Sequence, residues 1–242
     1  MLQACLNGGL SKEAHPQIPI TPLELAASAK AVRAAGADEL HIHVRSADGA
    51  ETLEPTAVAD AIVAIRNAVP GMPVGIGTGE WISPGGVERH EHMIKWTERP
   101  DYASVNLGED DAPDVIKLLV EQDVRVEAGL WNQRDAERFV SEVTFSSCLR
   151  ILVEMTSGDP VAALAEARAV MKVIAQAECM LPLLLHGEGG SVWACLDEAW
   201  RLQISGRIGF EDGLQLPDGS LAPDNESLVR EAMRRRTLSK LP

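Results

Sequence analysis

Two histidines separated by one residue lie in an apolar run of the sequence, at His41 and His43. The run Glu39–Val44 is short and rich in aliphatic side chains, which predicts a buried β-strand. Alternate residues of a strand face the same side, so both imidazoles are expected to point into one volume. Such a pair can supply two ligands to a divalent metal ion. Two neutral core histidines held by hydrogen bonds would show the same spacing, so a further ligand must come from elsewhere in the chain.

We interpret Glu211, near the other end of the chain, as the third ligand. Two histidines and a carboxylate leave one coordination position open for substrate or water, which is the pattern of catalytic zinc. The same ligand set suits non-haem iron(II). Such an ion polarises a carbonyl group and stabilises the charge that develops on its oxygen. An acidic turn after a strand is the alternative interpretation of Glu211 and Asp212.

Asp212 and Arg207 are candidate catalytic residues beside this carboxylate. A carboxylate close to both a metal ion and a guanidinium group can act as a general base. In a regular strand, however, Asp212 would face away from Glu211, because successive side chains alternate. A shared site for both carboxylates therefore requires the chain to bend at this point.

The elements that must position these residues alternate between strand and helix. The predicted strands are Leu2–Asn7, Glu39–Val44, Pro73–Gly77, Tyr102–Asn106, Arg125–Gly129, Arg150–Glu154, Leu181–His186 and Arg207–Glu211. The predicted helices are Pro22–Ala35, Pro55–Ala68, Gly86–Thr97, Ala112–Glu121, Gln133–Glu142, Pro160–Gln176, Ser191–Ile204 and Asn225–Thr237. This alternation over 242 residues predicts a (β/α)8 TIM barrel as a single domain, residues 1–242. A doubly wound open sheet is the competing topology, but its usual G-x-G-x-x-G fingerprint is absent.

A (β/α)8 barrel carries its functional residues at the C-terminal ends of the strands and in the loops that follow. The predicted second and eighth strands both flank the first, so His41, His43 and Glu211 can converge with one strand between them. His90 and His92 have the same spacing as the first pair, but they lie in a predicted helix. Residues two apart on a helix do not share a face, so these two are expected to be solvated.

The overall charge and the cysteines restrict the partners and the compartment. A net charge of −14 and a pI of about 4.8 argue against nucleic acid or an anionic membrane as a partner. The four cysteines are widely spaced and form no Cys-x-x-Cys pair, which is typical of buried thiols in a reducing compartment. No stretch approaches 18 uninterrupted apolar residues, and no basic region precedes the short apolar run at the N-terminus. We therefore expect a cytoplasmic protein.

Several spaced motifs together resemble the β-keto acid cleavage enzymes. They are Leu6-Asn7-Gly8, Pro19-Ile20-Thr21-Pro22-Leu23-Glu24-Leu25-Ala26, Ala35-Gly36-Ala37, His41-Ile42-His43-Val44-Arg45, Arg207-Ile208-Gly209-Phe210-Glu211-Asp212, Leu221-Ala222 and Asn225. They occur in the order of the family and extend from end to end of the chain. The resemblance implies a zinc-bearing barrel, usually a homo-oligomer such as a tetramer or dimer. It also implies that a small-molecule β-keto acid reacts with acetyl-CoA to give acetoacetate and a new acyl-CoA.

The resemblance also implies roles for individual residues. His41, His43 and Glu211 match the metal ligands of the family. Asp212 matches the base that removes a proton from the carbon between carboxylate and ketone, and Arg207 matches its partner. The positions that match substrate contacts are Thr78, Gly79, Ser104 and Asn106, together with Glu127, the retained first carboxylate of a Glu-x-Glu pair after the fifth strand.

Three positions depart from the family pattern. Gly77 occupies a position where a hydroxyl group is expected, and Gly129 replaces the second carboxylate of the Glu-x-Glu pair. Leu10 lies near a position that is acidic in members acting on amino-substituted keto acids, which favours a neutral or anionic substrate. Because of these departures, two alternatives stay open: a CoA-independent metal-assisted carbon–carbon lyase or isomerase, and a non-catalytic ligand-binding barrel.

Overall fold

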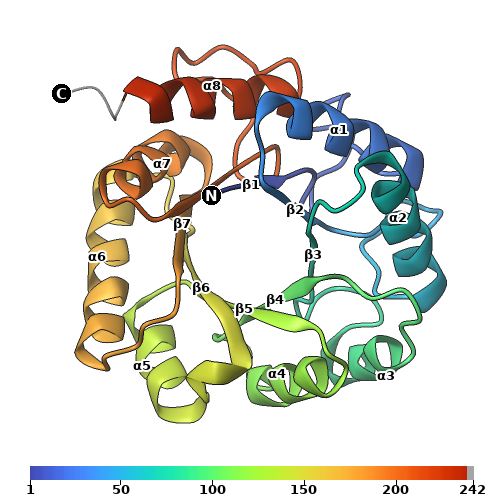
Figure 1. Cartoon of the computed structure of the whole chain (residues 1–242), viewed down its shortest axis with the longest axis horizontal. Coiled ribbons are helices and arrows are strands. Elements are labelled where there is room, and N and C mark those ends of the chain that lie inside the picture. The colour runs from blue at the N-terminus through green and yellow to red at the C-terminus, as the bar shows by residue number, and fades with distance from the viewer. Residues whose placement is uncertain (239–242) are drawn as a thin grey trace.

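Eight parallel strands close into a barrel in the computed structural model of the protein, which describes residues 1–238 (Figure 1). The strands follow one another around the barrel in chain order, and the eighth strand pairs with the first. The helices lie outside the ring of strands (Figure 1). The predicted (β/α)8 fold is therefore confirmed. The last four residues of the predicted domain 1–242 lie outside the described residues.

The elements alternate along the chain as this fold requires. The strands are β1 (Leu2–Cys5), β2 (Glu39–Ile42), β3 (Val74–Gly77), β4 (Tyr102–Asn106), β5 (Arg125–Leu130), β6 (Cys148–Met155), β7 (Leu183–Gly187) and β8 (Ser205–Ile208). The α-helices are α1 (Pro22–Ala35), α2 (Pro55–Ala68), α3 (Arg89–Ile94), α4 (Ala112–Glu121), α5 (Gln133–Glu142), α6 (Pro160–Gln176), α7 (Val192–Arg201) and α8 (Asn225–Leu238). The short 3-10 helices are η1 (Gly86–Glu88), η2 (Phe145–Ser147) and η3 (Gly189–Ser191). Among the described residues, no helix combines the length and the apolar character needed to cross a membrane.

The helices α1, α2, α4, α5 and α6 have the predicted bounds. The ends of α1 show the local signals that fix such bounds. In α1 the Thr21 hydroxyl accepts a hydrogen bond from the Glu24 N–H, and the Glu24 carboxylate accepts one from the Thr21 N–H. This reciprocal capping box satisfies two free N–H groups of the first turn. Pro22 occupies the first helical position, where a missing N–H costs nothing. Gly36 ends the helix with a φ of 113°, a conformation that glycine adopts without strain.

Three predicted helices differ from the structure, one of them only in that α8 extends one residue beyond Thr237, to Leu238. The predicted helix 86–97 is the turn η1 followed by α3, which ends at Ile94, and the predicted helix 191–204 is α7, which ends at Arg201. Gly85 and Gly86 have φ values of 87° and 48°. The chain therefore enters the first of these segments through a tight turn that a regular helix does not contain.

A buried polar layer fills the barrel interior toward the N-terminal ends of the strands. It consists of Gln3, Glu39, Tyr102, Glu127 and Arg150. Arg150 forms ion pairs with both Glu39 and Glu127, and Gln3 Nε2 donates to Tyr102 Oη at 2.9 Å. Opposite charges and filled hydrogen-bond positions offset the cost of burying these groups. This polar layer lies beneath the open, C-terminal end of the barrel.

Candidate metal centre and catalytic site

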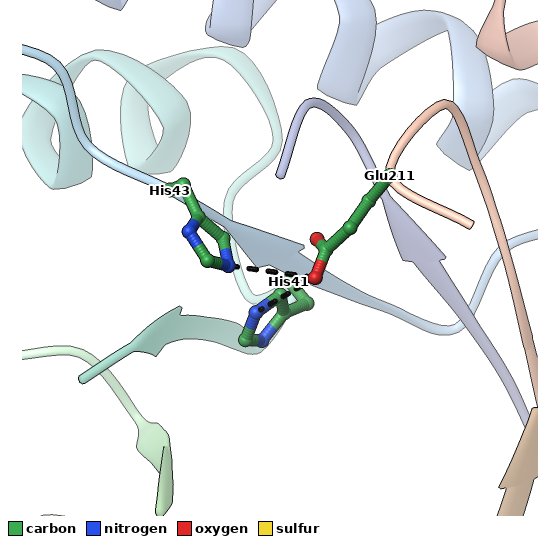
Figure 2. Close-up of side chains that lie close together, drawn as sticks. All are labelled: His41, His43 and Glu211. Atoms are coloured by element: carbon green, nitrogen blue, oxygen red, sulfur yellow. Dashed lines mark ion pairs between the residues drawn. The ribbon is translucent and has the colours of Figure 1, made fainter. Parts of the chain in front are cut away.

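His41 of β2, His43 just after it and Glu211 after β8 meet at one place (Figure 2). The strand β2 ends at Ile42, two residues before the predicted end at Val44. His41 Nε2 lies 3.8 Å from Glu211 Oε1, and His43 Nε2 lies 3.4 Å from the same oxygen. One ligand atom from each residue lies within 4.8 Å of the others. The ligands of a tetrahedral zinc ion, each about 2.0–2.1 Å from it, are roughly 3.3 Å apart. The structure thus brings together the three residues that were expected to converge, at a spacing that suits a divalent ion.

The protein leaves polar atoms of this cluster without partners. His41 Nδ1 and Glu211 Oε2 are buried, and no hydrogen bond reaches them from residues 1–238. Burial lowers the pKa of His41 to about 3, so its ring is neutral. Burial opposes ionisation of Glu211, but Arg207 and His43 hold the pKa of Glu211 well below its usual value. A neutral imidazole and an ionised carboxylate are the forms that bind metal, so His41 and Glu211 fit a divalent cation.

Glu211 and Asp212 lie in a turn that follows β8. The strand ends at Ile208, and the Asp212 N–H donates to Gly209 O at 3.0 Å. Arg207 reaches both carboxylates, with Nη2 donating to Glu211 Oε1 at 2.5 Å and Nε donating to Asp212 Oδ1 at 2.9 Å. The predicted eighth strand is therefore too long at its C-terminal end. The turn interrupts the alternation of the strand, so both carboxylates face one guanidinium group.

Two glycines allow this turn to pack closely against the start of the chain. A Cβ atom on Gly209 would lie 1.9 Å from the carbonyl oxygen of Cys5. A Cβ atom on Gly8 would lie 2.4 Å from Glu211 Cγ, and Gly8 has a φ of +51°. Side chains tolerate neither the contacts nor, at Gly8, the backbone conformation. Glu211 can therefore take this position only because Gly8 has no side chain.

The Gly8→Ala variant is expected to bind zinc about 10- to 100-fold more weakly, as happens when a residue that orients a metal ligand is changed. The added methyl group displaces Glu211 from the two histidines. Competition titration with a chromophoric chelator measures the affinity. Gly219→Ala is the matched control, since Gly219 also has a positive φ, +84°, but nothing lies within 4 Å of its Cβ position. Equal zinc affinities of the two variants would contradict the prediction.

Glu51 is a carboxylate of the site that sequence reasoning missed. Its Oε1 contacts His43 Nδ1, the ring nitrogen that faces away from Glu211. A carboxylate in this position fixes the tautomer and orientation of a metal-binding imidazole. Burial lowers the pKa of His43, but Glu211 and Glu51 outweigh that effect and raise it to about 9. Gly77, where a hydroxyl was expected, leaves space for the same ring, because its Cβ would lie 2.7 Å from His43 Nε2.

Glu51→Gln is expected to lower zinc affinity about 10- to 100-fold, since second partners of metal-binding histidines contribute this much. Glutamine keeps the size of the side chain but removes the charge that orients the ring. The same chelator competition measures the effect, and Glu13→Gln, at an exposed loop position, is the control. An affinity within twofold of wild type would show that Glu51 does not support the metal centre.

Asp212 has one engaged oxygen and one free oxygen. Its Oδ1 accepts the hydrogen bond from Arg207 Nε, whereas its Oδ2 is buried and has no hydrogen-bond partner in the described part of the chain. Arg207 is itself only 2% exposed, and although burial disfavours its charge, Asp212 and the other nearby acids raise its pKa well above the usual value. The guanidinium is therefore a fixed positive charge that links Asp212 to Glu211. Oδ2 is the one polar atom of this carboxylate that the described residues leave without a hydrogen bond.

Three of the positions expected to contact substrate lie at strand ends: Thr78 and Gly79 follow β3, and Asn106 is the last residue of β4. The fourth, Ser104, lies in the middle of β4. The Thr78 hydroxyl donates to the Ser104 carbonyl oxygen at 2.6 Å, and Asn106 Nδ2 donates to Glu109 Oε1 at 2.8 Å. These donors fix the loops that carry them.

Glu127 lies apart from these residues, in the buried polar layer. It is fully buried, pairs with Arg150, and accepts from Gln3 Nε2 at 3.1 Å. The strand β5 continues to Leu130, so Glu127 is its third residue and does not lie at its C-terminal end. We therefore replace the expected substrate contact with a structural role for this residue.

His90 is also placed differently from the prediction. Its side chain is 19% exposed, and Nε2 lies 2.9 Å from Asp111 Oδ2. The same aspartate pairs with Arg89, a fully buried residue that also donates to Glu109. The expectation of a solvated His90 is thus wrong, because α3 packs against the loop that follows β4. Its partners belong to that loop, and the three-residue metal cluster does not include it.

The fold and the site together define the class of protein: a (β/α)8 barrel with a candidate divalent-metal cluster and an adjacent buried carboxylate. A sequence model of the β-keto acid cleavage enzymes matches residues 1–239. The chain belongs to this family, as its motifs indicated.

Characterised proteins resemble the chain over nearly its whole length. It is 25% identical to the 3-keto-5-aminohexanoate cleavage enzyme of Fusobacterium nucleatum, with 96% of this chain and 88% of the relative covered. It is 26% identical to the 3-oxoadipate:acetyl-CoA acetyltransferase of Cupriavidus necator, with 96% and 86% covered. The solved apo structure of ObcA superposes with a TM-score of 0.75 at 15% identity and covers 90% of this chain. The chain spans 61% of that structure, and the likeness supports the fold.

Proposed function

We propose that the protein is a zinc-dependent enzyme that cleaves a neutral or anionic β-keto acid by reaction with acetyl-CoA. The products are acetoacetate and a new acyl-CoA. The observation that carries the proposal is the free, buried Oδ2 of Asp212, held by Arg207 beside the cluster of His41, His43 and Glu211. Family membership and the names of two relatives, one of them an acetyl-CoA acetyltransferase, support it.

The proposed reaction begins with removal of a proton from the carbon between the carboxylate and the ketone. Asp212 Oδ2 accepts that proton while Arg207 holds Oδ1. A zinc ion bound by His41, His43 and Glu211 would supply stabilisation of the negative charge on the ketone oxygen. The enolate carbon attacks the acetyl carbonyl of acetyl-CoA and displaces CoA. The CoA thiolate then attacks the original ketone, and breaking of the carbon–carbon bond releases the new acyl-CoA and the enolate of acetoacetate. The proton held by Asp212 returns to this enolate and completes acetoacetate.

The edge of the site near Leu10 supports a neutral or anionic substrate tail. Arg45 Nη2 donates to Leu10 O at 3.0 Å, and the Arg45 Nε is buried without a partner in residues 1–238. The apolar Leu10 side chain suits an alkyl group of the substrate. The Arg45 guanidinium attracts a carboxylate and repels an ammonium group. We propose that Thr78, Gly79, Ser104 and Asn106 border the rest of the bound substrate.

Isotope-labelled acetyl-CoA tests the reaction directly. Zinc-loaded protein is incubated with acetyl-CoA carrying ¹³C in both acetyl carbons and with one of three β-keto acids: 3-oxohexanoate, 3-oxoadipate or 5-amino-3-oxohexanoate. The proposed reaction transfers the labelled acetyl group to C3 and C4 of acetoacetate and leaves the new acyl-CoA unlabelled. We expect label in acetoacetate with the neutral or the anionic acid, and little with the cationic one.

The outcomes separate the proposal from the alternatives. Cleavage that proceeds equally well without acetyl-CoA would overturn it in favour of a CoA-independent lyase or isomerase. Thermal stabilisation by a β-keto acid without any turnover would indicate a ligand-binding barrel. Preference for 5-amino-3-oxohexanoate would contradict only the substrate assignment at Leu10 and Arg45.

We further propose that the protein works in the cytoplasm as a dimer or tetramer, with small molecules rather than nucleic acid or membrane as ligands. The four cysteines are free thiols, which supports a reducing compartment. The resemblance to a family of homo-oligomers motivates the proposed assembly, which goes beyond family membership itself. Native mass spectrometry that finds only monomer would contradict the assembly.

A further inference from the structure

His186 is a buried histidine of β7 that the proposed reaction does not yet use. It is only 1% exposed, and it lies between carboxylates that come from two different elements. Its Nδ1 is 3.3 Å from Asp212 Oδ1, and its Nε2 is 3.7 Å from Glu154 Oε2 on β6. Neither ring nitrogen completes a hydrogen bond of good geometry within residues 1–238, so the contacts are those of ion pairs. A buried imidazole in this position is held by charge on both sides.

The two oxygens of Asp212 differ in their contacts with positively charged groups. Arg207 Nε and His186 Nδ1 both approach Oδ1, at 2.9 and 3.3 Å. No donor of the described chain reaches Oδ2, which is also buried. Two positively polarised groups on one oxygen fix the plane of a carboxylate, since rotating that plane would lengthen both contacts. In the orientation that the structure shows, Oδ2 is the oxygen that keeps its hydrogen-bonding capacity free among the described residues.

We infer that His186 is a positioning residue, which together with Arg207 fixes the Asp212 carboxylate so that Oδ2 faces the substrate. Glu154 holds the other side of the ring and so sets the direction of Nδ1. The inference rests on the proposed function, because it assigns Asp212 the proton-accepting role. Burial and Arg207 disfavour a charged imidazole, yet Asp212 and Glu154 raise the pKa of His186 to about 9, so both nitrogens carry protons at neutral pH.

We infer that Glu154 and His186 compensate for the carboxylate that is absent at Gly129, near the end of β5. The family pattern provides a second carboxylate at the position of Gly129, and a Cβ there would lie 3.2 Å from Asn106 Oδ1. Here the second carboxylate near the base comes from β6, as Glu154, and acts through a histidine of β7. In the barrel β7 lies next to β8, and β6 is the next strand beyond it.

Two variants of His186 separate orientation from packing. His186→Leu removes both nitrogens, whereas His186→Asn keeps an N–H donor near the position of Nδ1. Proton abstraction by Asp212 can be measured separately, in the absence of acetyl-CoA. NMR in D2O follows the rate at which the α-protons of 3-oxohexanoate or 3-oxoadipate exchange for deuterium. We expect His186→Leu to slow exchange and kcat about 100-fold with KM changed less than about twofold, because misplaced catalytic groups lose rate rather than binding. His186→Asn is expected to recover about tenfold of that loss, and zinc content is expected to stay at the wild-type level in both.

Several results would overturn the inference. The first is an exchange rate of His186→Leu within twofold of the wild-type rate. The second is equal exchange rates for the Asn and Leu variants. The third is a wild-type exchange rate no higher than the uncatalysed rate. If His186→Leu does not fold, His186→Gln replaces it, since its longer amide reaches toward Glu154; the Asn variant must then be the faster of the two. His90→Leu is the matched control and is expected to exchange at the wild-type rate. Exchange that depends on His186, without labelled acetoacetate in the acetyl-CoA assay, would refute the proposed function and still support this inference.

Discussion

The Asp212→Asn variant is expected to turn over substrate about a thousandfold more slowly than wild type, within the range of about 10²–10⁴ that a general base contributes. Asparagine has the same shape, and its oxygen can still accept the hydrogen bond from Arg207 Nε. Its amide group cannot accept a proton, so removal of the α-proton of the substrate stops. Zinc content is expected to stay unchanged, because Glu211 keeps its own ion pair with Arg207 at 2.5 Å. Steady-state kinetics and metal analysis of the same preparation measure both quantities.

Asp114→Asn is the matched control for this experiment. Asp114 is exposed in the first turn of α4 and lies outside the site, so its variant is expected to keep wild-type turnover. A kcat of Asp212→Asn within tenfold of wild type would exclude Asp212 as the base. Loss of zinc together with activity would instead assign Asp212 to the metal centre.

Removing any one of the three clustered side chains is expected to empty the metal site. His41→Ala, His43→Ala and Glu211→Ala should each reduce bound zinc from about one ion per chain to below about a tenth, since catalytic zinc needs three protein ligands. Turnover is expected to fall below detection in all three variants. Inductively coupled plasma mass spectrometry of protein purified without added metal gives the stoichiometry.

His90→Ala is the control for histidine loss outside the metal cluster. His90 pairs with Asp111 in the loop after β4, so its variant is expected to keep both zinc and turnover. Full zinc occupancy in the His41→Ala variant would contradict the ligand assignment. Iron in the wild-type protein would replace zinc in the proposal, and no metal after reconstitution would show that His41 and His43 are structural.

Local chemistry made the scaffold predictable from the sequence. Thr21, Pro22 and Glu24 mark the start of α1, and Gly36 marks its end, whatever the rest of the chain does. The boundaries of the strands at the site were less predictable. The eighth strand ends at Ile208 because Gly209 must approach the carbonyl of Cys5, and that contact is distant in sequence.

The candidate site could be predicted where the spacing of residues in the sequence alone sets the direction of their side chains. The i, i+2 spacing of His41 and His43 is enough to direct both rings to one side of β2. Glu51 was missed because it lies in an irregular loop, where no period shows which way a side chain points. Glu127 was misplaced for a different reason: its depth in the barrel depends on where β5 ends, and the sequence signal extends only to Gly129. The role of His186 depends on neighbours from two other strands, which no local pattern encodes.

The three clustered side chains come from opposite ends of the chain, and this has a consequence for how the protein is made. An ion held by His43 and Glu211 would close a loop of about 170 residues, a link whose entropic effect is large. Asn225 secures the same junction by bonding Leu6 O and the Phe210 N–H, each at 2.8 Å. A nascent chain on the ribosome has two ligands from an early stage but lacks the third until nearly all of it has emerged. Capture of an ion by all three residues would therefore be a late event in biosynthesis, and occupancy of the centre would record that the ring of strands has closed.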